Sequence, residues 1–223
     1  MPTRVLFIRH GETSWNRVKR IQGHIDIPLA ETGALQAQRL AERLAREARD
    51  GLRLDAIYSS DLQRAQQTAQ PTASALGIVP NLVEGLRERS YGIFQGHDSE
   101  EIAQRYPDEY AHWQTRDPGF APAGGESVRG FYHRVVHAVA AIVAKHPGGR
   151  IACVTHGGVL DCVYRHANGL ALDAPRDYPL LNTSINTVEF DGGGAAKVLD
   201  WADVTHLGSA SDDDGLAKGG ARK

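Results

Sequence analysis

Three short apolar runs, each followed directly by a polar turn, constrain the fold of this chain most strongly. They are Val5–Ile8, Ala56–Ser59 and Ile151–Val154. Apolar runs of this length, rich in β-branched residues, are typical of strands that are buried on both faces of a parallel sheet. The chain therefore predicts three strands at the centre of a sheet that is covered on both sides.

Amphipathic segments separate these runs. Apolar residues recur at three- and four-residue steps over residues 34–48, which predicts a helix with Thr32 as its N-cap. Further helices are predicted over residues 61–76, 127–145 and 157–168. Because strands alternate with helices, we predict an α/β three-layer sandwich with a mostly parallel central sheet and helices on both faces.

The rest of the chain departs from this alternation. Two antiparallel strands are predicted around residues 186–190 and 197–201, joined by a glycine-rich turn. Residues 84–126 are predicted to form an insertion over the site rather than a second core. We thus predict one domain over residues 1–207. A disordered tail is predicted over residues 208–223, because they lack apolar periodicity.

Composition excludes several classes of partner. The 223 residues carry a net charge of −2 at pH 7, so neither nucleic acid nor an anionic membrane is expected to bind. Cys153 and Cys162 cannot form a disulfide framework and are expected to be buried, reduced thiols. The N-terminal apolar run is too short for a signal peptide or a membrane span, and we expect a cytoplasmic protein.

Polar side chains follow each of the three apolar runs. Arg9 and His10 follow the first run, Arg64 lies one turn into the helix after the second, and His156 follows the third. In an open parallel sheet, ligands bind outside the carboxyl ends of the strands. We therefore expect two histidines and two arginines from distant parts of the chain to meet at one site.

This set of side chains fits phosphoryl transfer. Two guanidinium groups can bind phosphate oxygens, a neutral imidazole can attack phosphorus, and a second, protonated histidine can stabilise the oxygens. Helix N-termini after Ser60 and Gly157 would add backbone N–H donors. Glu88, between Arg87 and Arg89, is the best-placed carboxyl to protonate a leaving oxygen. These groups can carry the charge without a metal ion, so no metal site is predicted.

Two other chemistries fit the sequence less well. Cys153 and His156 could begin a zinc site, but Cys153 lies inside an apolar run and no second pair completes four ligands. Ser127 could suggest a serine hydrolase, yet the nucleophile elbow requires Gly where Arg129 stands. We interpret Ser127 as a helix N-cap.

A series of different short motifs follows along the chain from residue 4 to residue 190. The first is the Arg-His-Gly signature within Leu6–Asn16. The others are Gln22-Gly23, Pro28-Leu29 with Thr32-Gly33, Ser59-Ser60-Asp61-Leu62 with Arg64-Ala65 and Thr68-Ala69, Leu86 with Glu88, Gly124-Gly125-Glu126-Ser127, and Val154-Thr155-His156-Gly157-Gly158. This series resembles the motifs of the histidine phosphatase superfamily, in its phosphoglycerate-mutase-like branch.

The resemblance implies a role for each residue of the expected site. It implies His10 as the nucleophile, Glu88 as the proton donor, and His156, Arg9 and Arg64 as the rest of the phosphate pocket. It also implies phosphate or substrate contacts by four further residues, which are Asn16, Gln22, Gly23 and Gly157. No cofactor is implied, except 2,3-bisphosphoglycerate if the protein is a mutase.

The family contains phosphatases, which give the phosphoryl group to water, and mutases, which return it to substrate. Gln95 resembles the mutase form, whereas Gln22 before Gly23 resembles the phosphatases. Residues 97–118 lack the lysine and the arginine pair of the mutases. We therefore predict a metal-independent phosphomonoester hydrolase that uses a phosphohistidine intermediate and acts on small phosphorylated metabolites. The alternatives are a 2,3-bisphosphoglycerate-dependent phosphoglycerate mutase and, less favoured, a non-catalytic phosphoester-binding module.

The insertion is rich in aromatic residues that could stack on a substrate ring or pack the insertion itself, and packing is the simpler interpretation. They are Tyr91, Phe94, Tyr106, Tyr110 and Trp113. The sequence does not disclose the physiological substrate, any regulator or the oligomeric state, for which a homodimer is one option.

Overall fold

Six strands in the described part of the chain form one mixed sheet, with the order β3-β2-β4-β1-β5-β6. The structure is a computed structural model that describes residues 1–208, so the tail predicted over 208–223 lies, beyond Gly208, outside the described residues. The strands are β1 (Thr3–Arg9), β2 (Ala56–Ser59), β3 (Asn81–Leu82), β4 (Arg150–Thr155), β5 (Ile185–Phe190) and β6 (Ala196–Asp203).

The three predicted apolar runs lie side by side at the centre of this sheet. Val154 of β4 pairs with Ile8 of β1 on one side and with Ser59 of β2 on the other, and both pairings are parallel. β3 also pairs in parallel with β2, whereas β5 and β6 are antiparallel, as predicted for the C-terminal strands. This register brings the carboxyl ends of β1, β2 and β4 to one edge.

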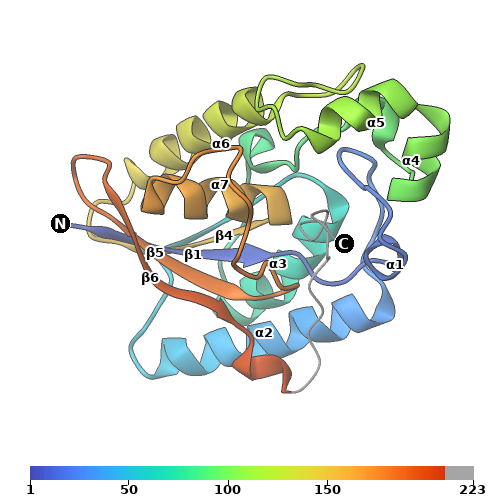
Figure 1. Cartoon of the computed structure of the whole chain (residues 1–223). Helices are drawn as coiled ribbons and strands as arrows, with labels where there is room; N and C mark the ends of the chain where they lie inside the picture. Colours follow the sequence, from blue (N-terminus) through green and yellow to red (C-terminus); the bar gives the residue numbers. More distant parts are fainter. Residues whose placement is uncertain (209–223) are drawn as a thin grey trace.

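Helices cover both faces of the sheet, which confirms the predicted α/β three-layer sandwich (Figure 1). α2 (Glu31–Arg49) and α3 (Gln63–Leu76) cover one face, and α6 (Val128–Val143) and α7 (Gly157–Asn168) cover the other. A separate apolar core lies on each side. Both contain side chains of β1, β2 and β4, because these strands are buried on both faces.

Two helix starts differ from the predicted ones. α2 begins at Glu31 with Ala30 as its N-cap, so Thr32 is inside the first turn and is not the cap. The N-cap is tied to the first loop, because the Ala30 N–H donates to the Glu12 carbonyl oxygen at 2.9 Å, and a Cβ on Gly33 would lie 2.1 Å from the same oxygen. α3 begins two residues later than predicted, at Gln63. By contrast, Ser127 caps α6 as predicted, and its hydroxyl accepts a hydrogen bond from the Gly130 N–H at 3.0 Å.

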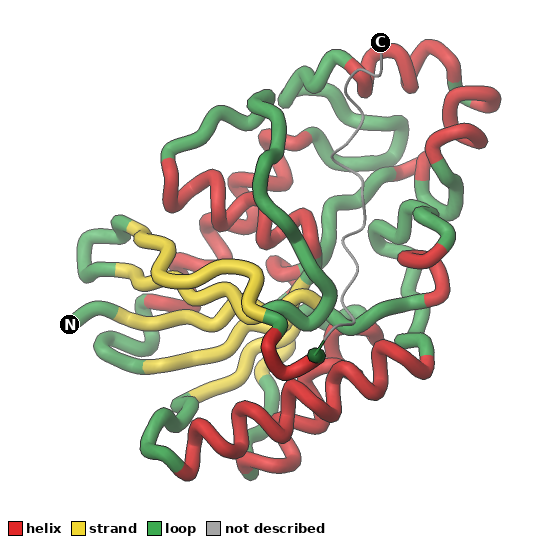
Figure 2. Tube along the Cα trace, turned by 60° about the horizontal axis from the view of Figure 1, so that its bottom comes forward, coloured by secondary structure: helices red, strands yellow, loops and turns green. Residues whose placement is uncertain are grey.

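The insertion at 84–126 lies at one end of the molecule (Figure 2). It contains two 3₁₀ turns, Glu84–Leu86 and Gly92–Phe94, and the helices α4 (Ser99–Arg105) and α5 (Pro107–Gln114). We predicted no second core there, but the insertion packs around a small apolar cluster in which Phe94, Ile102 and Ile21 are buried. All five aromatic residues named above pack in this cluster, as the packing interpretation expects, and Tyr91, Tyr110 and Trp113 also line a cavity beside the insertion.

The remaining predicted features concern cysteines and membranes. Cys153 and Cys162 are buried and unpaired, and burial raises the pKa of both thiols. Among residues 1–208, none of the helices is long and apolar enough to cross a membrane.

Candidate active site

The two histidines and two arginines predicted to meet do lie together at the carboxyl edge of the sheet. The ring centroids of His10 and His156 are 5.2 Å apart. Arg9 and Arg64 line a small cavity with His10, and each of the four side chains is at most 3% exposed. The parallel register explains this convergence, because Arg9 is the last residue of β1, and Ser60 and His156 directly follow β2 and β4.

A backbone contact fixes the orientation of the His10 ring. Its Nδ1 lies 2.7 Å from the Gly11 carbonyl oxygen, which only accepts, so Nδ1 carries the hydrogen and the lone pair is on Nε2. Burial holds the pKa of His10 well below its usual range, and the positive charges of Arg64 and Arg9 lower it further. The ring is therefore neutral at pH 7, with Nε2 as the nucleophilic nitrogen.

His156 is oriented by a residue of the neighbouring strand end. Its Nε2 lies 2.8 Å from the Ser60 hydroxyl, and its buried Nδ1 has no hydrogen-bond partner among residues 1–208. Burial, followed by Arg64 and His10, holds the pKa of His156 well below its usual range. The surrounding protein groups therefore favour the neutral ring, whereas the predicted role requires the protonated one. A phosphate anion beside it would favour the protonated form.

Backbone carbonyls orient the two guanidinium groups. Arg64 donates to the Gly23 oxygen at 2.7 Å and to the Ile25 oxygen at 3.1 Å, while its buried Nε has no partner in the described part of the chain. Arg9 donates to the Leu180 oxygen. Burial lowers the pKa of Arg64 to about 10, so it stays charged at pH 7. Both groups are therefore fixed cations beside His10.

Two backbone N–H groups hold the Glu88 carboxylate. Its Oε1 accepts from Arg89 at 2.9 Å, and its Oε2 accepts from Gly158 at 3.0 Å. The approach to α7 is so close that a Cβ on Gly158 would lie 2.2 Å from Oε1. Glu88 also lines the small cavity with His10. The absence of a side chain at residue 158 thus allows the first turn of α7 to anchor this carboxylate.

The four predicted contact residues fall in two places. Asn16, Gln22 and Gly23 line the small cavity, whose volume is about 40 Å³, and the buried Oε1 of Gln22 has no partner among the described residues. Gly157 lines a larger adjoining cavity of about 690 Å³. The Asn16 carboxamide oxygen is already used at the start of α1 (Ser14–Arg17), where it accepts from the Thr13 N–H.

Sequence reasoning missed the segment that supports the site from the far side. Asn182 donates to the His10 carbonyl oxygen at 2.8 Å, and the Thr183 N–H donates to the Arg9 oxygen at 3.0 Å. Thr183 is fully buried with a φ of 53°, an uncommon conformation for a β-branched residue. This segment follows no predicted strand, so no pattern marked it. Ser60 was expected at this edge from its position after the second apolar run, but its contact with His156 was not predicted.

The site offers the groups that phosphoryl transfer needs. A neutral imidazole, two fixed cations and an anchored carboxylate surround one cavity. Residues 1–208 hold no group of three or more His, Cys, Asp or Glu side chains suited to a metal ion.

Comparison with known proteins agrees with this arrangement. The chain matches the histidine phosphatase superfamily (branch 1) over residues 5–204. It belongs to this family. Like the members of that superfamily, the protein is an enzyme of the histidine phosphatase type, which confirms the resemblance drawn from the motifs.

Its relatives within the superfamily carry both mutase and phosphatase names. The chain is 40% identical over 205 residues to phosphoglycerate mutase-like protein 4 of Arabidopsis thaliana, covering 91% of this chain and 86% of that protein. It is 39% identical over 211 residues to the metal-independent phosphoserine phosphatase of the same plant, covering 93% and 84%. The solved structure of Bacillus stearothermophilus YhfR superposes with a TM-score of 0.82 at 36% identity, covering 92% and 99%.

Proposed function

We propose that this histidine phosphatase superfamily member hydrolyses phosphomonoesters of small metabolites through a phosphohistidine on His10. One observation carries the proposal: the Nδ1–H bond to the Gly11 carbonyl leaves Nε2 as the nucleophilic nitrogen in a cavity that Arg9, Arg64 and Glu88 also line. This is the arrangement that in-line attack on phosphorus requires.

In the first step, Nε2 of His10 attacks phosphorus as the ester P–O bond breaks. Glu88, which enters this step as the carboxylic acid, transfers its proton to the leaving oxygen, so the product is a neutral alcohol and Glu88 becomes a carboxylate. Arg9 and Arg64 neutralise the charge on the phosphoryl oxygens, and His156, oriented by Ser60, supplies a further donor once it is protonated.

In the second step, water attacks the phosphohistidine. Glu88, now a carboxylate, accepts a proton from this water while the P–N bond breaks. Inorganic phosphate leaves and His10 returns to its neutral form. Glu88 lines both the small and the large cavity, so the same carboxylate can serve the leaving group and the incoming water.

The insertion supports hydrolysis over mutase activity. Residues 97–118 contain no lysine, and Arg116, one of their two arginines, lines the larger cavity beside acidic residues such as Glu100. The phosphatase name of a relative that is 39% identical supports the same choice. Phosphoglycerate mutase activity stays the alternative, because another relative carries that name.

The test is an assay of the purified protein without added metal. One arm offers 3-phosphoglycerate primed with 2,3-bisphosphoglycerate, and the other offers a panel of phosphomonoesters that includes a chromogenic ester. We expect release of free phosphate from several esters with negligible isomerisation. Rapid isomerisation with little phosphate release would show that the protein is a mutase, and no reaction in either arm would refute both activities.

A further inference from the structure

The larger cavity adjoins the phosphate site and is where a leaving group would lie. It shares Lys19, Ile21, Glu88 and Tyr91 with the small cavity. A group bonded to the oxygen that Glu88 protonates would therefore extend from His10 into this space. At about 690 Å³, the cavity is within the usual range for small-molecule sites.

Lys19 stands at the junction of the two cavities in an unusual backbone conformation. Its φ is 52°, in the left-handed region that lysine seldom adopts, and such conformations are retained chiefly at functional sites. Two backbone hydrogen bonds hold the turn: the Lys19 N–H donates to the Asn16 oxygen and the Arg20 N–H donates to the Trp15 oxygen. The turn is thus tied to α1, whose Asn16 and Trp15 line the small cavity.

The neighbouring cations of this turn are already paired, whereas Lys19 is not. Arg17 pairs with Glu12, and Arg20 pairs with Glu101 at 3.2 Å. The Lys19 ammonium has neither a hydrogen bond nor an ion pair among residues 1–208. A charge directed at a ligand-sized cavity without a protein partner is suited to a charge on the ligand.

A second cation without an ion pair, Arg116, lines the larger cavity. It also has a positive φ, of 59°, and has no side-chain partner in the described range. Five carboxylates also line this cavity, and most of them have protein partners. Asp98 caps α4, Asp117 contacts His112, Asp161 pairs with Arg165, backbone N–H groups hold Glu88, and the Glu100 side chain has no partner among the described residues. A negatively charged leaving group can therefore contact Lys19 and Arg116 without displacing a protein partner of either side chain.

We propose that Lys19 is a specificity-determining residue that recognises a second negative charge, such as a carboxylate, on the leaving group of the phosphomonoester. This inference rests on the proposed hydrolase function and names the substrate class of that site. The Lys19 ammonium would bind the second anion at the mouth of the larger cavity, while Arg9 and Arg64 hold the phosphoryl group.

The experiment compares two esters that share a three-carbon skeleton. 3-Phosphoglycerate carries a carboxylate where glycerol 3-phosphate carries a neutral hydroxymethyl group. We expect the wild type to prefer 3-phosphoglycerate in kcat/KM. Lys19→Met should lower the ratio of the two kcat/KM values about tenfold. The change should lie chiefly in the KM for 3-phosphoglycerate, because the ammonium binds the ground state and the transition state alike. The kcat/KM of this variant for glycerol 3-phosphate should stay within about twofold of the wild type.

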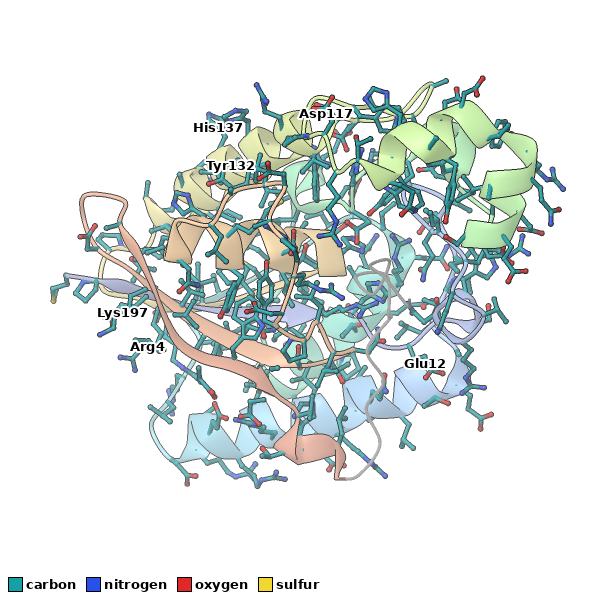
Figure 3. All side chains as sticks on the ribbon, in the orientation of Figure 1. Arg4, Glu12, Asp117, Tyr132, His137 and Lys197 are labelled. Carbon is teal, nitrogen blue, oxygen red and sulfur yellow. The ribbon has the colours of Figure 1, made fainter. Side chains whose placement is uncertain are left out.

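Two matched variants separate recognition from general effects of charge and folding. Lys197→Met removes the same charge from strand β6, which Figure 3 shows far from the insertion loop that carries Asp117; it should leave the preference unchanged. Lys19→Arg should retain most of the preference, because it keeps a cation at the same strained position. Thermal melting of each variant confirms that the proteins compared are folded.

The outcomes distinguish this inference from the function on which it rests. Hydrolysis of both esters without a preference, or an equal loss for both in Lys19→Met, would overturn the role of Lys19 and leave the hydrolase intact. Failure to release phosphate from either ester, and from the chromogenic ester, would overturn the hydrolase itself. Selective loss for 3-phosphoglycerate in Lys19→Met alone supports the proposal.

Discussion

The carboxyl edge of the sheet and the larger cavity beneath the insertion use charge in opposite ways. At the sheet edge, Arg9, His10, Arg64 and His156 are almost fully buried, and protein groups fix the orientation of each side chain. At the larger cavity, Lys19 is exposed and its ammonium has no partner among the described residues.

This difference suits the sheet edge to the proposed phosphoryl transfer and the larger cavity to the choice between leaving groups. Burial strengthens electrostatic interactions and lowers the pKa of both histidines, so the sheet edge suits a step in which charge develops on phosphorus. An exposed cation contributes less binding free energy than a buried one, but it can discriminate a charged leaving group from a neutral one. Substitutions at the sheet edge should therefore reduce turnover of every ester, whereas those at the cavity should change the ranking of esters.

The largest effect is expected for His10→Ala. Because this variant removes the proposed nucleophile, kcat should fall about 10⁴-fold or more for all esters, the chromogenic one included. Initial rates of phosphate release measure the loss, and acid quenching during turnover should trap a phosphorylated protein only when His10 is present. A residual rate above a hundredth of the wild type would contradict the nucleophile assignment.

Glu88→Gln should have the next largest effect, and one that depends on the leaving group. Loss of a general acid costs roughly 10²–10⁴-fold where the leaving oxygen needs a proton. Alkyl esters should therefore lose far more activity than a nitrophenyl ester, whose leaving group departs without protonation. The measurement is kcat/KM across esters of graded leaving-group pKa. An equal loss for all esters would argue against Glu88 as the acid.

Gly158→Ala should reproduce the Glu88 effect more weakly. A Cβ at residue 158 would lie 2.2 Å from Glu88 Oε1, the end of a flexible side chain that can move away. We expect about ten- to hundredfold loss of kcat with alkyl esters, since displacement of a catalytic group is costly, and a smaller loss with the nitrophenyl ester. Gly192→Ala is the control, because nothing lies within 4 Å of its added Cβ. Full activity of Gly158→Ala would show that the anchored position of Glu88 is unimportant.

The smallest effect concerns the pH dependence of stability. Folding lowers the pKa of His10 below its unfolded value near 6.5, so above pH 6.5 the histidine is neutral in both states and contributes no pH dependence. Below pH 6.5 only the unfolded chain gains the proton, and stability falls by up to about 1.4 kcal/mol per pH unit for this residue. His10→Ala should therefore lose less stability than the wild type between pH 6.5 and 5.5, as urea denaturation can measure. Equal losses in the two proteins would contradict a lowered pKa.

The central part of the fold and the side chains of the proposed site were predictable because their signals are local. Each apolar run is itself a central strand, and Arg9, His10 and His156 directly follow the runs. Parallel register then brings strand ends together without further information. The sequence by itself thus determined the central strands of the sheet, the family and the charged groups of the proposed phosphate site, but not the edge strand β3.

Only the tertiary structure decided how those groups are held and what lies beside them. Asn182 reaches the His10 carbonyl across 172 positions of the chain, and Gly158 anchors Glu88 across 70. Lys19 reaches the larger cavity through a left-handed turn that no apolar pattern marks. The physical reason is the range of the interactions: periodicity reports which face of an element is buried, whereas a hydrogen bond between distant segments exists only after they have packed.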